Sequence, residues 1–302
     1  MKNMQKTYKK RIFDRYDGWR IRKNDPLLVL IPYLMRTRND SQNLFEDDID
    51  ILRIEEFVRE YADEIPGLSI MTVLIAAVIR LISQRPMLNR FVVWNKIYAR
   101  NSLTLALSIK RQLTDDGEET TIKPEFEPTD TLYDVAAKIQ RELELSKPQG
   151  NVNGTDKTAR ALGDLPTPIL RTLVWFFFKL DAIGLLPKSI HKASPFHSTA
   201  FLTNVGSLGI KSIYHHLYEF GTCSLFVSMG KKTRYTEMDE NGQEKQKKRM
   251  TLKFVTDERI CDGHYYALSM RYLNKYLNNP ALLLNPPKQV FVDEGVGRPV
   301  GS

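Results

Sequence analysis

The chain has 302 residues, of which 42% are hydrophobic, 26% charged and 10% aromatic, and its formal net charge is +8. This composition excludes a wholly disordered protein, and the length allows one large domain or two small ones with a buried core. Two cysteines without C-x-x-C spacing exclude a disulfide framework and argue against a metal site. The N-terminus is polar and shows no secretory signal. Together with the two cysteines, this predicts a reducing, cytoplasmic location.

The positive charge is concentrated at the N-terminus. Residues 1–25 hold nine Lys and Arg against three Asp, a net of +6, so the rest of the chain is nearly balanced. Such an arm can bind nucleic acid, an anionic membrane or phosphorylated ligands, or it can be a solvated tail. Because no nucleic-acid motif or series of stacking aromatics accompanies it, we expect a solvated basic arm and no nucleic-acid partner.

The first elements after this arm have clear patterns. Residues 26–35 are apolar and are expected to pack against the body of the protein. Residues 44–51 alternate between apolar and acidic side chains, which predicts a strand with one face in water. The apolar spacing of 52–61 predicts an amphipathic helix. Residues 70–83 are apolar almost all round, so we expect a helix that is buried on most faces and capped by Ser69.

The middle of the chain alternates between strand and helix patterns. We expect a short hairpin from 91–94 and 97–99, a strand at 103–110, a helix at 131–145 and a loop at 147–158. A helical insertion follows at about 160–195, with the aromatic cluster Trp175–Phe178. Its apolar part is interrupted by Arg171, Lys179 and Asp181, so it is not a spanning helix, which needs about 20 apolar residues.

The last third contains strands, a hairpin and a helix. Strands are expected at 200–203, 224–229 and 252–256, a protruding ribbon around Asn241-Gly242, and a helix at 265–277. Because strands and helices interleave irregularly and no repeat occurs, we predict an α/β (α+β) two-layer sandwich with a mixed β-sheet flanked by helices.

Four segments resemble one known family. Asp257-Glu258-Arg259-Ile260-Cys261-Asp262-Gly263 resembles the Asp-His-Arg-x-x-Asp-Gly motif of 2-oxo acid dehydrogenase acyltransferases, and the His-His-x-x-x-Asp-Gly motif of chloramphenicol acetyltransferases. Thr203-Asn204-Val205-Gly206-Ser207-Leu208-Gly209 resembles their Ser-Asn-x-Gly-x-x-Gly. Residues 44–51 resemble the family's first core strand, and residues 76–91 resemble its helix followed by Pro-x-Leu-Asn. The four segments occur along the chain in the same order as in the family. The resemblance implies a single chloramphenicol acetyltransferase-like domain at 26–290, followed by a tail at 291–302.

The resemblance also implies a site between subunits of a homotrimer, or of a larger oligomer built from trimers. In the family, a His removes a proton from the attacking thiol or hydroxyl, and a Ser or Thr of the neighbouring subunit donates to the oxyanion. Thr203 matches the hydroxyl donor, whereas Glu258 occupies the position of the catalytic His. The structural positions of this site are matched by Asn204, Arg259, Asp262 and Gly263.

The lost His leaves three alternatives for Glu258. A solvated carboxylate, with a pKa of about 4.3, is a poor base towards a thiol of about 8.5, although burial can raise such a pKa by several units. Instead, Glu258 can form an ion pair with Arg259 or another basic residue, or His216 of the adjacent pair His215-His216 can replace it as the base. His197 and His264 are expected to be structural.

Three functions remain open. The first is transfer of an acyl group from a small-molecule substrate, between a CoA or lipoyl thioester and an unidentified acceptor. A CoA thioester is then the co-substrate, with no lipoyl group on this chain and no metal. The second is an inactive trimeric scaffold or ligand-binding relative. The third is a peripheral protein of anionic membranes, attached through the basic arm and the Trp175–Phe178 helix. This helix can instead pack on the body of its own chain, pack across the trimer or cover an acyl pocket.

Overall fold

The computed structural model describes residues 8, 11–110, 119–146, 163–238 and 241–297. The loop expected at 147–158 and most of the first ten residues lie outside this part of the chain. The helices are α1 (Pro26–Leu34), α2 (Leu52–Glu60), α3 (Ile70–Gln84), α4 (Leu132–Ser146), α6 (Thr167–Ala182), α7 (Lys188–Ala193) and α8 (Gly263–Asn278). The strands are β1 (Gly18–Arg20), β2 (Gln42–Asp50), β3 (Arg90–Val93), β4 (Lys96–Arg100), β5 (Leu103–Lys110), β6 (Glu119–Ile122), β7 (Glu125–Phe126), β8 (Ala200–Asn204), β9 (Leu225–Met238) and β10 (Glu244–Asp257).

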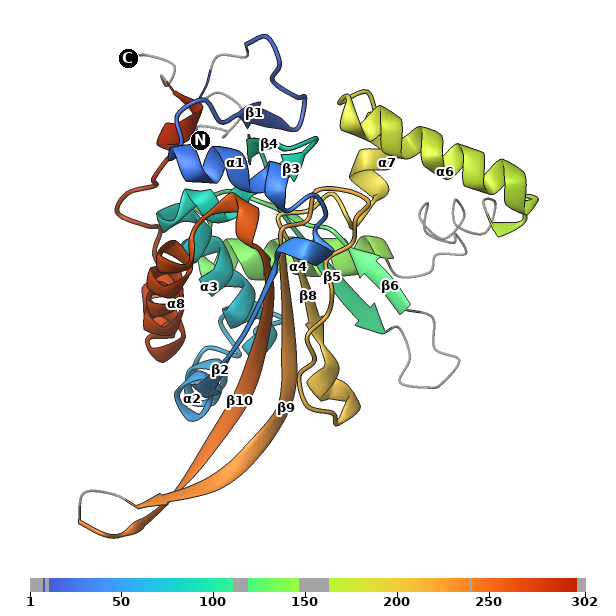
Figure 1. Cartoon of the computed structure of the whole chain (residues 1–302). Coiled ribbons are helices and arrows are strands. Elements are labelled where there is room, and N and C mark those ends of the chain that lie inside the picture. The colour runs from blue at the N-terminus through green and yellow to red at the C-terminus, as the bar shows by residue number, and fades with distance from the viewer. Residues whose placement is uncertain (1–7, 9–10, 111–118, 147–162, 239–240, 298–302) are drawn as a thin grey trace.

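A mixed sheet forms the centre of the molecule (Figure 1). Its strands follow the order β2-β10-β9-β8-β5-β6, and β7 also pairs with β5. The pairs β5–β8 and β8–β9 are parallel, whereas the other pairs are antiparallel. Helices α2, α3, α4 and α8 pack on one face and enclose the main hydrophobic core. The predicted mixed sheet flanked by helices is confirmed.

Helix α3 is the buried centre of the core. The hydroxyl of Ser69 accepts a hydrogen bond from the Thr72 backbone N–H at 3.1 Å, so the predicted cap is present. Every residue from Thr72 to Ser83 is buried. The helix ends where Pro86 cannot continue it, and this boundary also follows the prediction.

Strands β9 and β10 are longer than the sequence suggested. Each has 14 residues, and together they extend beyond the body as a ribbon at the lower end of Figure 1. Gly242 has a φ of 71°, a left-handed conformation that favours glycine, at the predicted hairpin turn. The outer half of the ribbon is exposed, which agrees with its charged side chains.

Both ends of the described chain pack on the body. Strand β1 pairs with β4 in a second sheet, β1-β4-β3, and Asp17 and Trp19 are buried. At the other end, the carboxylate of Asp293 accepts hydrogen bonds from the Arg90 guanidinium at 2.6 and 2.7 Å. The expectation of a solvated arm is therefore wrong for residues 17–20, because strand pairing and apolar burial hold them in place.

Helix α1 also differs from its prediction, because it is more exposed than expected. Its apolar composition led us to expect packing against the body, but only Leu28 and Pro32 are buried. The exposed side chains of the helix include Leu27, Val29, Leu30, Tyr33 and Leu34. Composition therefore does not decide which apolar helices this fold covers.

Candidate functional site

Thr203 lies at the end of β8, where the chain enters a 3₁₀ turn at Val205–Leu208. The Asn204 side chain accepts a hydrogen bond from the Ser207 backbone N–H at 3.2 Å and so caps this turn. At Gly206 a Cβ atom would collide with the Gly230 carbonyl, so only glycine lets the turn lie against β9. These contacts fix the backbone next to Thr203.

The second motif is organised by Asp257, at the end of β10. Its carboxylate is fully buried and accepts hydrogen bonds from Arg259 Nε at 2.8 Å and Nη2 at 2.7 Å. Arg38 Nε lies 3.9 Å from the same carboxylate. Of the alternatives for Glu258, an ion pair with Arg259 is wrong, because the guanidinium is already held by Asp257.

Asp262 and Gly263 begin helix α8. The Asp262 carboxylate accepts a hydrogen bond from the Tyr265 backbone N–H at 2.7 Å and caps the helix. The side chain is exposed and makes no ion pair with a residue that the structure describes. Gly263 is the first helical residue.

Two side chains of these motifs lack a polar partner. Glu258 is half-buried, and no hydrogen bond or ion pair joins its carboxylate to a described residue. The Thr203 hydroxyl, also half-buried, is equally unoccupied within the described residues. Neighbouring polar groups are engaged in caps or ion pairs, so these two remain available to a ligand.

One chain does not bring Thr203 and Glu258 together. Thr203 is in register with Ser228 of β9, and Ser228 with Lys253 of β10. Glu258 follows Lys253 by five residues, which corresponds to about 17 Å along the strand direction. The sheet therefore separates the two groups within one chain.

The histidine pair lies on the face of the sheet opposite the core helices. The His215 ring stacks on Phe226, with centroids 4.2 Å apart and planes at 5°. Its Nδ1 lies 2.9 Å from the His216 carbonyl and donates a hydrogen bond to it. The His216 ring is exposed and lies 5.0 Å from that of Tyr218. Since Phe226 is in register with Phe201, both histidines lie near the Thr203 strand.

A buried polar cluster joins the helical insertion to the N-terminal segment. Arg15 contacts Asp17 and Asp181, each at 2.8 Å, and His197 Nε2 lies 3.2 Å from Asp181. His191 Nε2 lies 3.4 Å from Asp17. Sequence reasoning missed this cluster; the only signal was a carboxylate, Asp181, within an apolar segment.

Burial sets the protonation of this cluster. It lowers the pKa of His197 to about 4, although the hydrogen bond to Asp181 opposes the shift. Burial would raise the pKa of Asp181, but the hydrogen bond from His197 and the charge of Arg15 outweigh it and lower that pKa. Nearby, burial lowers the pKa of Lys123 to about 7. His197 is therefore neutral at pH 7. His264 is exposed in the first turn of α8.

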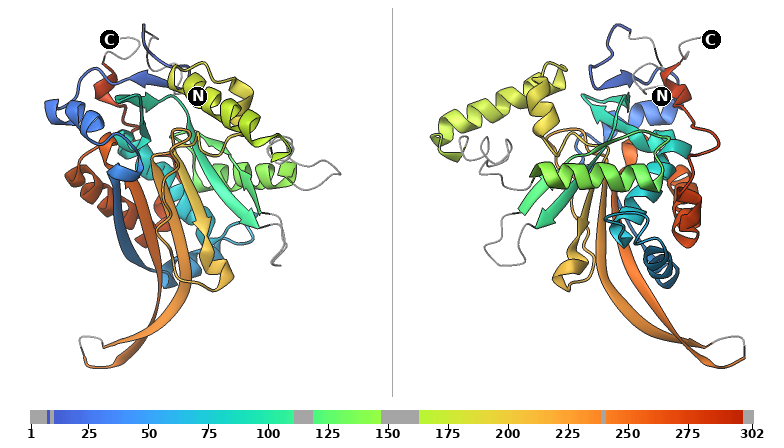
Figure 2. Two further views of the ribbon diagram at one scale, coloured as in Figure 1. Left: turned by 45° about the vertical axis from the view of Figure 1, so that its right-hand side comes forward. Right: turned by 180° about the vertical axis from the view of Figure 1, so that it is seen from behind.

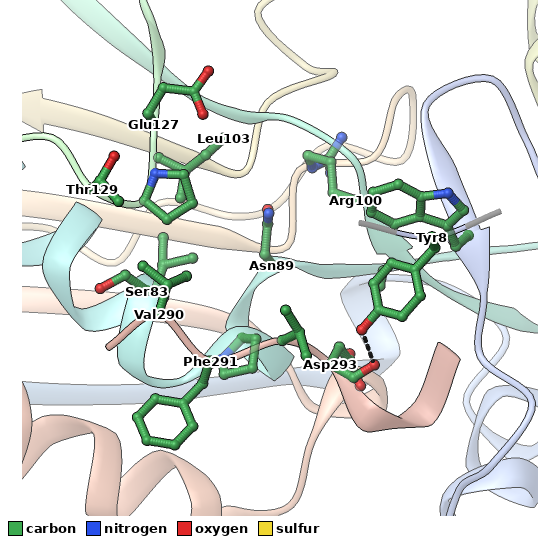
Figure 3. A pocket seen from close by; sticks show the side chains of 16 residues that line it. Tyr8, Ser83, Asn89, Arg100, Leu103, Glu127, Thr129, Val290, Phe291 and Asp293 are labelled. Atoms are coloured by element: carbon green, nitrogen blue, oxygen red, sulfur yellow. Dashed lines mark hydrogen bonds between the residues drawn. The ribbon is translucent and has the colours of Figure 1, made fainter. Parts of the chain in front are cut away.

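Three hollows flank this framework, one of them of about 260 Å³ beside Arg259 and Asp181. A cavity of about 320 Å³ lies among the end of α3, strand β4 and both chain ends, with Tyr8, Ser83, Asn89 and Asp293 among its walls (Figure 3). None of the predicted site residues lines it. A groove of about 1090 Å³ lies instead beside Asn204, Gly206 and Ser207. Its charged walls are Arg59, Lys231, Lys232, Lys248 and a single carboxylate, Glu55.

Comparison with known proteins places both motifs in one family pattern. Residues 188–285 match the model of the 2-oxoacid dehydrogenases acyltransferase (catalytic domain). A comparison with curated protein sequences gave no match.

Solved structures share the fold at low sequence identity. The cubic core of the pyruvate dehydrogenase multienzyme complex has a TM-score of 0.53 and 12% identity, over 87% of this chain and 93% of that chain. A probable dihydrolipoamide acetyltransferase from Listeria monocytogenes gives 0.52 and 12%, over 89% and 97%. A chloramphenicol acetyltransferase gives 0.52 and 10%, over 86% and 99%. The chain therefore has the chloramphenicol acetyltransferase-like fold, and its residues 188–285 match the family model of the 2-oxoacid dehydrogenase acyltransferase catalytic domain.

Proposed function

We propose that this chain catalyses transfer of an acyl group between a thioester, of CoA or a lipoyl group, and a nucleophilic acceptor. The observation that carries the proposal is the free state of Thr203 and Glu258 within the described residues, while the polar neighbours in both motifs are engaged. A hydroxyl that donates to an oxyanion and a carboxylate that accepts a proton must both be available to the substrate.

The two residues have separate tasks. The Thr203 hydroxyl donates a hydrogen bond to the tetrahedral oxyanion as it forms. Glu258 accepts the proton of the attacking thiol, hydroxyl or amine, and it becomes a stronger base when a partner subunit and substrate exclude water from it. Because the register places them about 17 Å apart in one chain, we propose a homotrimer, or a larger assembly of trimers, in which each site combines both residues from neighbouring copies.

The basic groove supports a phosphorylated thioester. It begins at Asn204, the residue after Thr203, and its basic side chains outnumber its single carboxylate. Lys and Arg bind phosphate oxygens through charge-assisted hydrogen bonds. Glu55 already accepts hydrogen bonds from Lys232 at 2.6 Å and from Lys248 at 2.7 Å, which leaves Lys231 and Arg59 for the phosphates of CoA.

A second candidate function is an inactive scaffold or ligand-binding relative. The replacement of the family His by Glu258 favours it, since a solvated carboxylate is a weak base towards a thiol. The two candidates differ in what each substitution does to turnover.

Release of CoA tests the proposal. Purified protein is incubated with acetyl-CoA or a longer acyl-CoA and with dihydrolipoamide, an alcohol or an amine, and CoA is measured by chromatography. We expect turnover that falls about 10²- to 10³-fold in Thr203→Ala and at least about 100-fold in Glu258→Gln. Thr236→Ala, on the outer ribbon, is the matched control and should keep wild-type turnover.

Two results would contradict the proposed acyl-transfer activity. The first is that the protein neither releases CoA nor binds acyl-CoA at millimolar concentration. Turnover that appears only in Glu258→His identifies an inactive relative with an intact framework.

A further inference from the structure

Helix α6 is apolar around most of its circumference but is not covered. Asp181 is its only buried residue. The exposed fractions of Trp175, Phe176 and Phe178 are 59%, 49% and 40%. A helix of this composition is normally buried in a core or against another apolar phase. The described residues therefore leave the apolar surface of α6 uncovered.

The orientation of α6 separates an inner and an outer face. Leu170, Leu173, Phe177 and Leu180 are half-buried at the three- and four-residue spacing of one helix face. At 100° per residue, Arg171, Trp175 and Lys179 lie on the opposite side. Lys179 Nζ lies 5.7 Å from the Trp175 ring, with its charge at the edge of the aromatic surface. The outward face thus combines a central aromatic residue with basic flanks.

A second uncovered apolar group lies at the same end of the molecule. It comprises Leu27, Leu30 and Leu34 of α1, Ile12 and Phe13 of the N-terminal segment, and Trp94 of the β3–β4 turn, all exposed. Figures 1 and 2 show α1, the β3–β4 turn and α6 at the upper end in every view, away from the β9–β10 ribbon. We call this surface, with the outer face of α6, the apolar end.

Charge at the apolar end is predominantly basic. Exposed basic residues on α6 and α7 are Arg171, Lys179, Lys188 and Lys192, and Arg36 follows α1. Of the nearby carboxylates, those of Asp14, Asp17 and Asp181 are neutralised in ion pairs with Arg22 and Arg15, whereas Asp25 and Asp164 are exposed, so two negative charges stand against five exposed basic residues. The uncovered aromatic surface therefore presents excess positive charge.

From this combination we propose that the apolar end docks on an anionic lipid bilayer, with α6 lying in the interface. Helices with exposed Trp, Phe and Leu and flanking Lys or Arg bury their apolar side about 5–10 Å into the headgroup boundary. No helix in the described part of the chain is long and apolar enough to cross a membrane, so the attachment is peripheral. A self-association through this surface would bring the basic flanks of two copies together, which is unfavourable, whereas acidic headgroups attract them.

Vesicle sedimentation tests the proposal independently of catalysis. The full chain is mixed with vesicles of phosphatidylcholine alone or of equimolar phosphatidylcholine and phosphatidylserine. We expect binding to the second and much weaker binding to the first, with affinity that falls as salt is raised. The triple variant Trp175→Ser/Phe176→Ser/Phe178→Ser should bind at least about tenfold more weakly. The double variant Arg171→Glu/Lys179→Glu should lose about fivefold or more in affinity for the anionic vesicles for each residue replaced.

Matched variants on other surfaces control for general effects. Tyr272→Ser removes from α8 an aromatic ring that is about as exposed as Phe178, and Arg234→Glu/Lys245→Glu reverses two exposed charges on the ribbon. Both should bind vesicles as the wild type does. Failure of the wild type to bind either vesicle overturns the proposal. It is also overturned if the triple variant binds vesicles normally but sediments as a smaller oligomer, because a second copy of the chain then covers α6.

Discussion

Helices α3 and α6 are alike in composition and opposite in environment. Both are long helices of mainly apolar residues, with 15 and 16 residues respectively. Every side chain from Thr72 to Ser83 of α3 is buried between the sheet and other helices, whereas α6 buries only Asp181. Figure 1 shows α3 against the sheet and α6 projecting from the body.

The difference lies in what holds each helix. Helix α3 is stabilised by apolar burial along its whole length, worth about 25 cal/mol per Å² of surface removed from water. The polar anchor of α6 is at its C-terminal end, where Asp181 meets Arg15 and His197. An apolar helix can thus belong to the core or remain exposed as a contact surface. Here the core helix is held by apolar burial along its length, and the exposed helix is held by polar contacts at one end. Three predictions test this contrast, from the largest effect to the smallest.

Loss of the α6 anchor should have the largest effect. Asp181→Ala removes one of the two carboxylates that hold the buried Arg15 guanidinium, and it also removes the partner of His197 Nε2. It should lower the free energy of unfolding by about 3–5 kcal/mol, measured by urea titration. Asp164→Ala, on the exposed approach to the same helix, should change it by less than about 0.5 kcal/mol. A double-mutant cycle with Arg15→Ala should show a coupling of at least about 1 kcal/mol. Additive effects would contradict the anchor.

A matched pair of isoleucines compares the two helices directly. Ile79 of α3 is 0% exposed and Ile169 of α6 is 55% exposed. Ile79→Ala should cost about 3 kcal/mol, because it removes buried methyl groups and leaves a cavity. Ile169→Ala should cost less than about 0.5 kcal/mol in the free protein. Equal losses in urea unfolding would show that α6 is packed as a core helix.

The anchor should also depend on pH, unlike the apolar contacts of α3. The pKa of His197 is about 4 in the folded chain and about 6.5 when unfolded, so between these values the unfolded chain binds more protons. Stability should therefore be highest above pH 6.5 and fall by up to about 3 kcal/mol as pH decreases towards 4. Urea titrations across this range should give a flatter profile for His197→Gln. The exposed His264→Gln is the control, and an unchanged slope in His197→Gln would assign the dependence to other groups.

Regular elements of the body were predictable because local pattern and tertiary packing agree there. The Ser69 cap, the all-apolar α3 and the Asn241-Gly242 turn each have a local cause, and each occurs where the sequence indicated. Strands β1, β6 and β7 were missed, since each has only two to four residues and depends on a partner strand for its conformation.

The candidate site was predictable as residues but not as geometry. Motif spacing singled out Thr203 and Glu258, whereas the choice of partner for Arg259 could not be read from the chain. Glu258 is adjacent in sequence, but the strand directs Asp257 inward, and the buried carboxylate takes the guanidinium. The roles of Thr203, Glu258 and His216 stay predictions.

The amino-acid sequence by itself determined the mixed α/β architecture, the buried helix α3 and the two motifs that the family shares, because these follow from periodicity, capping and local spacing. Only the tertiary structure decided that residues 18–20 form a strand, that α1 and α6 remain uncovered, and that Arg15, Asp181 and His197 meet. The physical reason is that burial and ion pairing depend on which segments reach the same place in space. For Arg15 and Asp181 those segments are 166 residues apart along the chain.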